Sequence, residues 1–448
     1  MKLNKFIGTN IHGYLNYEID FREDITFLIG INGTGKTSVL KLILGLISPS
    51  YNYLNQIEFD EVVLESTDSV PIKLSAIKDS NTIKILLSIN GEDTDGILTK
   101  YNINMPDSSL SRDEHREKLN TYKQLFEEEE VYDKIKKLAT PLFLGIDRRV
   151  YEGHNIDRNR NSFMLRKKMS QFALNDPLNV SLMDVQGLLY DYYRIIAGKQ
   201  PTINEKFKNK ILAQTFEFIE NQDVKLLNDF KELKKKRQDT LTAIENLNVG
   251  DFEEKIKLFF DKMENVLREI QDVEKQDKSK AVVEERIEVF QKWFTNQPQL
   301  KRINEIIMFS QSYQNEIDAL FEPVNKLKSL INHFFLESKK NIDIDERGDI
   351  SIVFKNGNTV EPYQLSSGEK QIISMLAHLV FFQLRYEKDG GIFIIDEPEL
   401  SLHLAWQEIF VKSLMKASPE TQFILATHSP AIISEFGGSY CEDLLKLN

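Results

Sequence analysis

The sequence has too few cysteines for a disulfide framework or a cysteine-based zinc cluster, and it lacks the long apolar run of a membrane span. Its 448 residues include one cysteine, Cys441, which excludes an internal disulfide framework and a cysteine-based zinc site. No stretch approaches the roughly eighteen consecutive apolar residues that a transmembrane helix requires. The first residues also lack the apolar core of a secretory signal. The composition therefore indicates a cytoplasmic protein without a membrane partner.

The chain is also poor in net positive charge. It has 57 basic and 69 acidic residues, a net charge of -12, which excludes a whole-chain electrostatic surface for nucleic acid. One basic stretch, from Arg148 to Lys168, is interleaved with Tyr151 and Phe163 and has the charge and stacking groups that a nucleic-acid strand requires. A solvated surface, or arginines that bind nucleotide or acidic neighbours, would show the same pattern. A DNA contact there is one hypothesis.

The chain does contain a phosphate-loop pattern, from Gly30 to Thr37. It follows the apolar run Ile25 to Ile29, which predicts a buried strand, and a helix is expected from Thr37 through Leu46. Glycines let backbone N–H groups approach phosphate, the lysine reaches the outer phosphates, and the threonine hydroxyl ligates Mg2+. The loop residues predicted to contact ATP are Asn32, Gly33, Thr34, Gly35, Lys36, Thr37 and Ser38.

A second motif, Ile392 to Glu397, predicts a central strand that ends in two carboxylates. We expect Asp396 to hold Mg2+ through water and Glu397 to act as general base on the attacking water. Another apolar strand, beginning at Phe423, ends in a polar trio that includes His428, which is placed to sense the terminal phosphate. The predicted catalytic residues are therefore Glu397 and His428, and the predicted metal ligands are Thr37 and Asp396.

Between these motifs lies the string Leu365-Ser-Ser-Gly-Glu-Lys-Gln371. It resembles the signature motif of ABC-type ATPases, in the variant of the SMC, RecF and OLD-like branch of AAA-family ATPases. The resemblance implies a head-to-tail homodimer or a higher homo-oligomer, in which the signature of one subunit covers the ATP of the other. The residues implied in that contact are Ser366, Ser367, Gly368 and Glu369. An ordinary helix cap would show the same Ser-Ser-Gly sequence.

Two further features concern this branch. The string Pro398 to His403 resembles its D-loop, which implies that Glu399 and Ser401 face the partner subunit, whereas His403 is equally compatible with a helix cap or with packing. The predicted strand at 141–146 is not followed by the glutamine that ligates Mg2+ in many ABC-type ATPases. Asp147 is a possible substitute there.

These patterns predict an α/β fold with a mixed β-sheet core in an ABC-type ATPase head and an inserted helical or short coiled-coil lobe. The expected parts are an N-terminal ATPase lobe at 1–150, a helical insert at 151–340 and a C-terminal ATPase lobe at 341–448. Strands are expected at 57–64, 72–77 and 82–89. Two β-hairpins should lead to the signature.

Within the insert, helix breaks are expected near Gly198–Pro201, Asn248–Gly250 and Pro298. Apolar positions from Leu226 to Leu247 alternate in steps of four and three, as in a coiled-coil seam, and an amphipathic bundle helix would show a similar pattern.

With this signature and this length, the chain resembles ATPase subunits of bacterial anti-phage systems of the Septu and retron-associated kind. That resemblance implies a Mg-dependent ATPase that gates a separate HNH-type nuclease, and no nuclease activity is expected in this chain, which ends shortly after His428. A RecF-like DNA-repair ATPase that clamps DNA, and a nucleotide-bound scaffold with little hydrolysis, remain alternatives. A transporter subunit is disfavoured by the missing glutamine and the charged middle region.

Overall fold

In the computed structural model, the chain folds into two compact units. The described ranges are 1–67, 70–100, 112–138, 141–146, 148, 150–152, 176–216, 229–247, 253–274, 280–386 and 391–447. The first unit comprises Met1–Tyr192 with Val324–Asn448, and the second comprises Tyr193–Pro323. The second unit spans fewer residues than the predicted insert at 151–340, because both ends of that range belong to the first unit.

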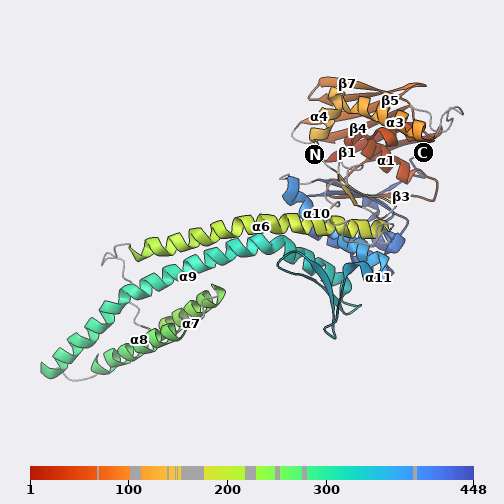
Figure 1. Cartoon of the computed structure of the whole chain (residues 1–448). Coiled ribbons are helices and arrows are strands. Elements are labelled where there is room, and N and C mark those ends of the chain that lie inside the picture. Colours follow the sequence, from red (N-terminus) through yellow and green to blue (C-terminus); the bar gives the residue numbers. More distant parts are fainter. Residues whose placement is uncertain are drawn as a thin grey trace. The chain divides into compact units, whose positions relative to one another are not determined.

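The first unit contains a six-stranded antiparallel sheet with the strand order β2-β1-β4-β5-β6-β7 (Figure 1). Buried and exposed residues alternate along β2, as expected when one face of a strand lies on the core. The strands predicted at 72–77 and 82–89 are confirmed as β5 and β6, and the strand predicted at 57–64 is β4, which begins only at Glu61. The sheet consists of β1 (Leu3–Ile11), β2 (Leu15–Asp20), β4 (Glu61–Thr67), β5 (Pro71–Lys78), β6 (Thr82–Ile89) and β7 (Glu92–Thr99).

A second six-stranded sheet has the order β15-β3-β14-β13-β8-β9. Strands β3, β14, β13 and β8 are parallel neighbours, so their carboxyl ends meet at one edge. Residues of β13 and β14 are buried throughout, as is typical of parallel strands covered on both faces. The strands are β3 (Ile25–Ile29), β8 (Leu142–Leu144), β9 (Val150–Glu152), β13 (Ile392–Asp396), β14 (Gln422–Ala426) and β15 (Cys441–Asp443).

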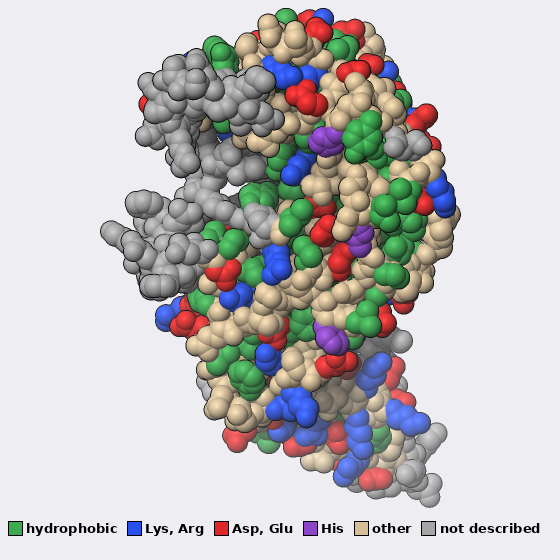
Figure 2. Space-filling model, turned by 90° about the vertical axis from the view of Figure 1, so that its right-hand side faces the viewer, with side chains coloured by type: hydrophobic (Ala, Val, Ile, Leu, Met, Phe, Trp, Pro, Cys, Tyr) green, Lys and Arg blue, Asp and Glu red, His purple; other side chains and the backbone are tan. Residues whose placement is uncertain are grey.

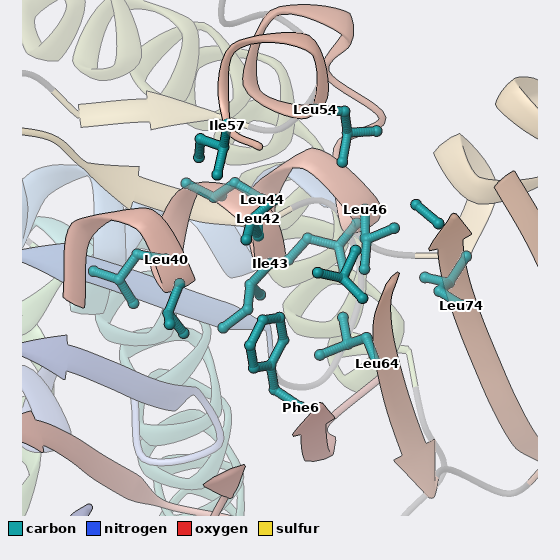
Figure 3. Close-up of a cluster of buried hydrophobic side chains, with 14 of the residues drawn as sticks. Phe6, Leu40, Leu42, Ile43, Leu44, Leu46, Leu54, Ile57, Leu64 and Leu74 are labelled. Carbon is teal, nitrogen blue, oxygen red and sulfur yellow. The ribbon is translucent and has the colours of Figure 1, made fainter. Parts of the chain in front are cut away.

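Helix α1 (Lys36–Ile47) packs against strands of both sheets, and most of its residues are buried. It is apolar on nearly all sides, which is the pattern of a helix enclosed by other elements. Figure 3 shows its side chains gathered with Phe6 of β1 and Leu64 of β4. The helices that complete this lobe are α2 (Tyr51–Gln56), α3 (Arg112–Glu127) and α4 (Glu130–Leu138). The core thus fixes the position at which α1 begins.

A small three-stranded sheet precedes the signature helix. It consists of β10 (Lys340–Ile344), β11 (Ile350–Phe354) and β12 (Thr359–Val360), and both predicted hairpins are confirmed. Gly348 and Gly357 adopt the left-handed backbone that these tight turns require. The remaining elements of this unit are η5 (Pro362–Gln364), α10 (Ser367–Tyr386), η6 (Pro398–Ser401), α11 (Leu404–Ala417), α12 (Pro430–Ile433) and η7 (Gly438–Tyr440).

Helix α6 (Pro177–Thr215) begins in the first unit, where it is hydrogen-bonded to the turn between β10 and β11. The Gln186 side-chain amide donates to the Gly348 carbonyl and accepts from the Ile350 N–H. The hydroxyls of Ser181 and Ser374 are hydrogen-bonded between α6 and α10. The start of α6 therefore belongs structurally to the first unit.

The second unit is helical. It contains the later part of α6, α7 (Phe230–Asn246), α8 (Glu253–Glu274) and the first part of α9 (Lys280–Phe335). Leu233 of α7 and Phe260 of α8 lie in a core with Trp293 of α9. The Arg237 guanidinium, at a polar position of the predicted seam, pairs with the Asp261 carboxylate of α8 at 2.8 Å. Within the described ranges, no helix is both long and apolar enough to span a bilayer.

Two predicted helix breaks are wrong. Helix α6 continues through Gly198–Pro201 and α9 continues through Pro298. A proline inside a helix costs about 3 kcal/mol. Burial of Trp293 and Leu300 on either side of Pro298 outweighs that cost. The third predicted break, at Asn248–Gly250, and the seam residue Leu226 lie outside the described residues.

Candidate active site

The phosphate loop joins the end of β3 to the start of α1, and its glycines are required by geometry. Gly33 and Gly35 have φ angles of 89° and 73°, in the left-handed region. A Cβ atom at Gly30 would lie 2.7 Å from the Thr34 hydroxyl oxygen, and one at Gly35 would lie 3.0 Å from Leu15 Cδ1. The loop therefore has the tight curvature that presents backbone N–H groups to an anion.

Lys36 lies inside the curve of this loop and is 5% exposed. Its Nζ donates to the Gly30 carbonyl at 2.9 Å and to the Ile31 carbonyl at 3.2 Å. Burial lowers the pKa of Lys36, and the nearby carboxylates of Glu397, Asp396 and Glu399 partly offset that effect. The ammonium group is thus held where it can pair with phosphate oxygens.

A hydrogen bond connects the two ends of the chain at this edge of the sheet. The Thr37 hydroxyl donates to Asp396 Oδ1 at 3.2 Å, across a sequence separation of 359 residues. Asp396 is 2% exposed, and burial raises its pKa to about 6 despite the Thr37 hydrogen bond. A hydroxyl and a carboxylate supply the oxygen ligands that Mg2+ prefers, so the donor set fits this ion.

The two predicted catalytic side chains lie beside each other. Glu397 has a left-handed backbone with φ 48°, and its N–H donates to the Ala426 carbonyl at 2.9 Å. Its Oε1 atom is 3.9 Å from Nε2 of His428. Their side chains are 26% and 33% exposed, so both reach solvent at the carboxyl edge of the sheet. This is the position that a substrate and an attacking water would approach.

The signature residues form a capping box at the start of α10. The Ser366 backbone N–H and hydroxyl both donate to Glu369 Oε2, at 2.9 and 2.8 Å. Lys340 of β10 donates to the other oxygen of this carboxylate at 2.7 Å, and Glu369 is 4% exposed. The helix-cap interpretation is therefore confirmed for Ser366 and Glu369. Ser366 and Ser367 are exposed, and their contact with ATP stays a prediction.

The D-loop packs directly under the signature. A Cβ atom at Gly368 would lie 2.4 Å from the Ser401 carbonyl oxygen, so only glycine permits this approach. The Glu399 carboxylate turns into its own chain, where the His428 N–H donates to it at 2.6 Å. The expectation that Glu399 and Ser401 face a partner subunit stays a prediction. His403 occupies the N-cap position of α11 without a side-chain cap bond.

Two residues beside the loop were not predicted to have a role there. The Tyr17 hydroxyl of β2 donates to the Thr34 carbonyl at 2.6 Å, and His12 Nε2 lies 2.8 Å from the Ser38 hydroxyl. A tyrosine at a buried strand position needs a partner for its hydroxyl, which is a weak sequence signal. His12 carries no such signal, because its contact depends on the turn that joins β1 to β2.

Several predictions fall outside the described residues. Asp147 and most of the basic stretch from Arg148 to Lys168 are among these, although Arg148 itself is described and has a left-handed backbone. Figure 2 shows one face of the molecule, on which the described basic and acidic side chains are interspersed. The DNA contact through the basic stretch therefore stays a prediction.

Residues 1–433 match the family model of the AAA ATPase domain. The retron Vc95 probable ATPase of Vibrio cholerae serotype O1 biovar El Tor is 28% identical over 185 residues, which cover 37% of this chain and 35% of that protein. The Septu protein PtuA of Bacillus thuringiensis is 35% identical over 94 residues, 19% of this chain and 24% of PtuA. The endonuclease GajA of Bacillus cereus (strain VD045) is 27% identical over 125 residues, 28% of this chain and 21% of GajA.

Among solved structures, an Smc head domain with a coiled coil and joint from Pyrococcus yayanosii has a TM-score of 0.37 at 14% identity, covering 97% of this chain and 93% of that one. The chain spans about a third of the retron ATPase and about a quarter of PtuA. The family model, in contrast, includes the phosphate loop, the paired carboxylates and His428 in a single match. The chain therefore belongs to the AAA ATPase domain family.

Proposed function

We propose that this protein binds ATP with Mg2+ and hydrolyses it at the carboxyl edge of the β3, β14 and β13 strands. The observation that carries the proposal is the hydrogen bond from Thr37 to Asp396, which joins the phosphate loop to the paired carboxylates. Lys36 and the Glu397–His428 pair lie at the same edge. This edge of the sheet thus combines a charge partner for phosphate, a set of metal ligands and a candidate general base.

Each group has a distinct role in this proposal. The loop N–H groups and Lys36 would hold the phosphates, and Thr37 and Asp396 would hold Mg2+, whose charge would neutralise the negative charge that develops on the transferred phosphoryl group. Glu397 orients and deprotonates the attacking water. His428, 3.9 Å away, contacts the terminal phosphate and orders the Glu397 carboxylate.

The exposed signature supports a homodimeric or higher active assembly. Ser367 presents its hydroxyl at the N-terminus of α10, where the helix dipole favours an anion. In a head-to-tail dimer, this hydroxyl would contact the terminal phosphate of the ATP held by the other subunit. The Ser366 hydroxyl would have to leave the Glu369 carboxylate, to which it donates at 2.8 Å, to make the same contact. ATP would then hold two subunits together, and hydrolysis would release them.

We further propose that the protein is the ATPase subunit of a bacterial anti-phage complex and gates a separate nuclease of the HNH type. The partial matches to retron ATPases and to the Septu protein PtuA support this role. We expect no nuclease activity from this chain itself. A RecF-like clamp on DNA is the main alternative, and a nucleotide-bound scaffold with little hydrolysis is the second.

Turnover by the purified protein tests the catalytic proposal. Glu397→Gln should keep ATP affinity and lower kcat by about a hundredfold or more, because the base is lost and the shape is retained. Chelation of Mg2+ should also stop turnover. Glu408→Gln, on the exposed surface of α11, is the matched control and should behave as wild type. Unchanged turnover in Glu397→Gln would remove its role as base, and absent turnover in the wild type would favour the scaffold.

Phage plaquing efficiency tests the biological role. Cells should carry the gene with its neighbouring reading frames, the ATPase gene alone, or the operon with Glu397→Gln. Protection that needs both a neighbouring gene and an intact Glu397 supports the two-part system. Absence of protection against a broad phage panel, together with tight and salt-sensitive DNA binding by the purified protein, would favour the RecF-like alternative.

A further inference from the structure

Glu399 makes two hydrogen bonds that reach from the D-loop to the end of β14. Its Oε1 atom accepts from the His428 N–H at 2.6 Å, and its Oε2 atom accepts from the Thr427 hydroxyl at 2.9 Å. Thr427 is 1% exposed, so its hydroxyl depends on a protein partner. Both oxygens of one carboxylate are thus used to fix the two residues at the tip of this strand.

A second connection runs parallel to the first. The Gln407 side-chain amide donates to the Leu402 carbonyl at 2.8 Å and accepts from the Ser429 hydroxyl at 2.5 Å. Ser429 follows His428 directly. Glu399 and Leu402 of the D-loop are therefore connected, directly or through Gln407, to the residues on both sides of His428.

The other side of the D-loop touches the signature helix. The Ser401 carbonyl fills the space above Gly368, and the Gln371 side chain donates to the Pro398 carbonyl at 3.4 Å. The D-loop therefore lies between the exposed signature and the catalytic pair. The Glu399 carboxylate joins it directly to the backbone N–H of His428.

We propose that Glu399 is a positioning residue for ATP hydrolysis, which holds His428 beside Glu397 and makes that placement dependent on the D-loop and the signature. The inference rests on the proposed hydrolysis and deepens it. Glu399 acts through His428 and does not contact the reacting atoms. A signature engaged by a second subunit would in this way adjust the Glu397–His428 pair of its own chain.

A purely structural role would predict a different pattern of mutant effects. If Glu399 only stabilises the fold, its substitution should lower kcat by the same factor whether or not His428 is present. If Glu399 positions His428, its substitution should have no further effect on kcat once the imidazole has been removed. A double-mutant cycle between Glu399 and His428, measured on kcat, separates the two cases. Melting temperature and ATP affinity, measured on the same preparations, report the structural effect independently.

We expect Glu399→Ala to lower kcat about tenfold or more, with ATP affinity changed less than about threefold. Glu399→Gln should recover most of the rate, because an amide oxygen still accepts from the His428 N–H. In the His428→Ala background, Glu399→Ala should lower kcat by less than about twofold. Glu408→Ala, which removes an exposed carboxylate from the neighbouring α11, should match wild type in either background.

Two results would overturn the inference while hydrolysis stands. One is a wild-type rate in Glu399→Ala, and the other is an equal loss from Glu399→Ala with and without His428. If Glu399→Ala does not fold, Thr427→Val in both backgrounds decides the question, because it removes one of the two bonds to the same carboxylate. Absence of turnover in the wild-type protein would instead overturn the proposed function, and this inference with it.

Discussion

At the scale of the residue, the site depends on charged groups whose burial is unfavourable unless nucleotide and metal are bound. Lys36 is nearly buried with carbonyl groups as its hydrogen-bond partners, and Asp396 is buried with a raised pKa. Both arrangements lower the folding stability of the protein without nucleotide, compared with the protein in which phosphate and a divalent cation are bound. Binding of the nucleotide with its metal would therefore give both buried groups a partner of opposite charge.

Lys36→Ala tests this argument. Hydrogen bonds to a charged group contribute about 1.5–3 kcal/mol each, so ATP affinity should fall by roughly ten- to a hundredfold or more. Titration with a fluorescent ATP analogue measures this change. Lys412→Ala, which removes an exposed lysine paired with Glu435, is the matched control and should bind as wild type. Near-normal affinity in Lys36→Ala would contradict the assignment of the phosphate loop.

At the scale of the element, the signature helix is fixed on two sides by the first unit. Lys340 of β10 pairs with Glu369, and Lys370 Nζ donates to Asn179 Oδ1 of α6 at 2.8 Å. Burial acts to raise the pKa of Glu369, but the Lys340 pair and the Ser366 hydrogen bonds outweigh it and the pKa is lowered from 4.5. The carboxylate therefore stabilises the fold in its ionised form.

Lys340→Met should remove that stabilisation. Because Lys340 is partly exposed, the loss is about 2–3 kcal/mol rather than the full value for a buried pair. A lowered carboxylate pKa contributes stability above pH 4.5, and this contribution is lost as the pH falls through the native value. The difference between Lys340→Met and wild type should thus be largest at neutral pH and shrink in acid.

The two tryptophans of the chain allow this to be measured, because Trp293 lies in the second unit and Trp406 in the first. In a Trp293→Phe background, Trp406 fluorescence during urea unfolding reports the unit that contains the signature. Lys355→Met, at an exposed position of the same hairpin region, is the control. A difference that stays constant between pH 7 and pH 4 would contradict the role of the ion pair.

Helices and strands could be predicted from the sequence where neighbouring residues alone determine them. The helix expected from Thr37 through Leu46 is α1, because the phosphate loop and an apolar run determine its start and its burial. The break expected at Pro298 was wrong because the packing of Trp293 and Leu300 outweighed local propensity. Helix α6 also continues through Gly198–Pro201, where nothing in the burial of these residues explains it. The contact from Glu399 to His428 was not predictable, because nothing in the spacing of these residues shows which way the carboxylate turns.

At the scale of the whole molecule, the site is assembled from both ends of the chain. The helical second unit is inserted between them, from Tyr193 to Pro323. The phosphate loop and the catalytic pair meet within one chain, whereas the exposed hydroxyl of Ser367 is placed to act on another. The proposed dimer would therefore contain two composite sites, each with contributions from both subunits.

Mixing two inactive variants tests this arrangement. Gly368 is a poor choice for the signature variant, because any Cβ there would meet the Ser401 carbonyl of its own chain. Ser367→Arg is better, since Ser367 is exposed and its side chain can change without disturbing the core. Lys36→Ala and Ser367→Arg should each be nearly inactive alone, the first for lack of bound ATP and the second for lack of a working signature.

In a mixed dimer, one site combines both substitutions and the other combines neither. Random pairing makes about half of the dimers mixed, so an equal mixture should recover about a quarter of the wild-type turnover per subunit if the two sites act independently. A chain that carries both substitutions should recover nothing when mixed with itself. Activity that stays at the level of the parents after subunit exchange, with exchange verified by differently tagged chains, would contradict a shared site and favour a subunit that completes its ATP site alone.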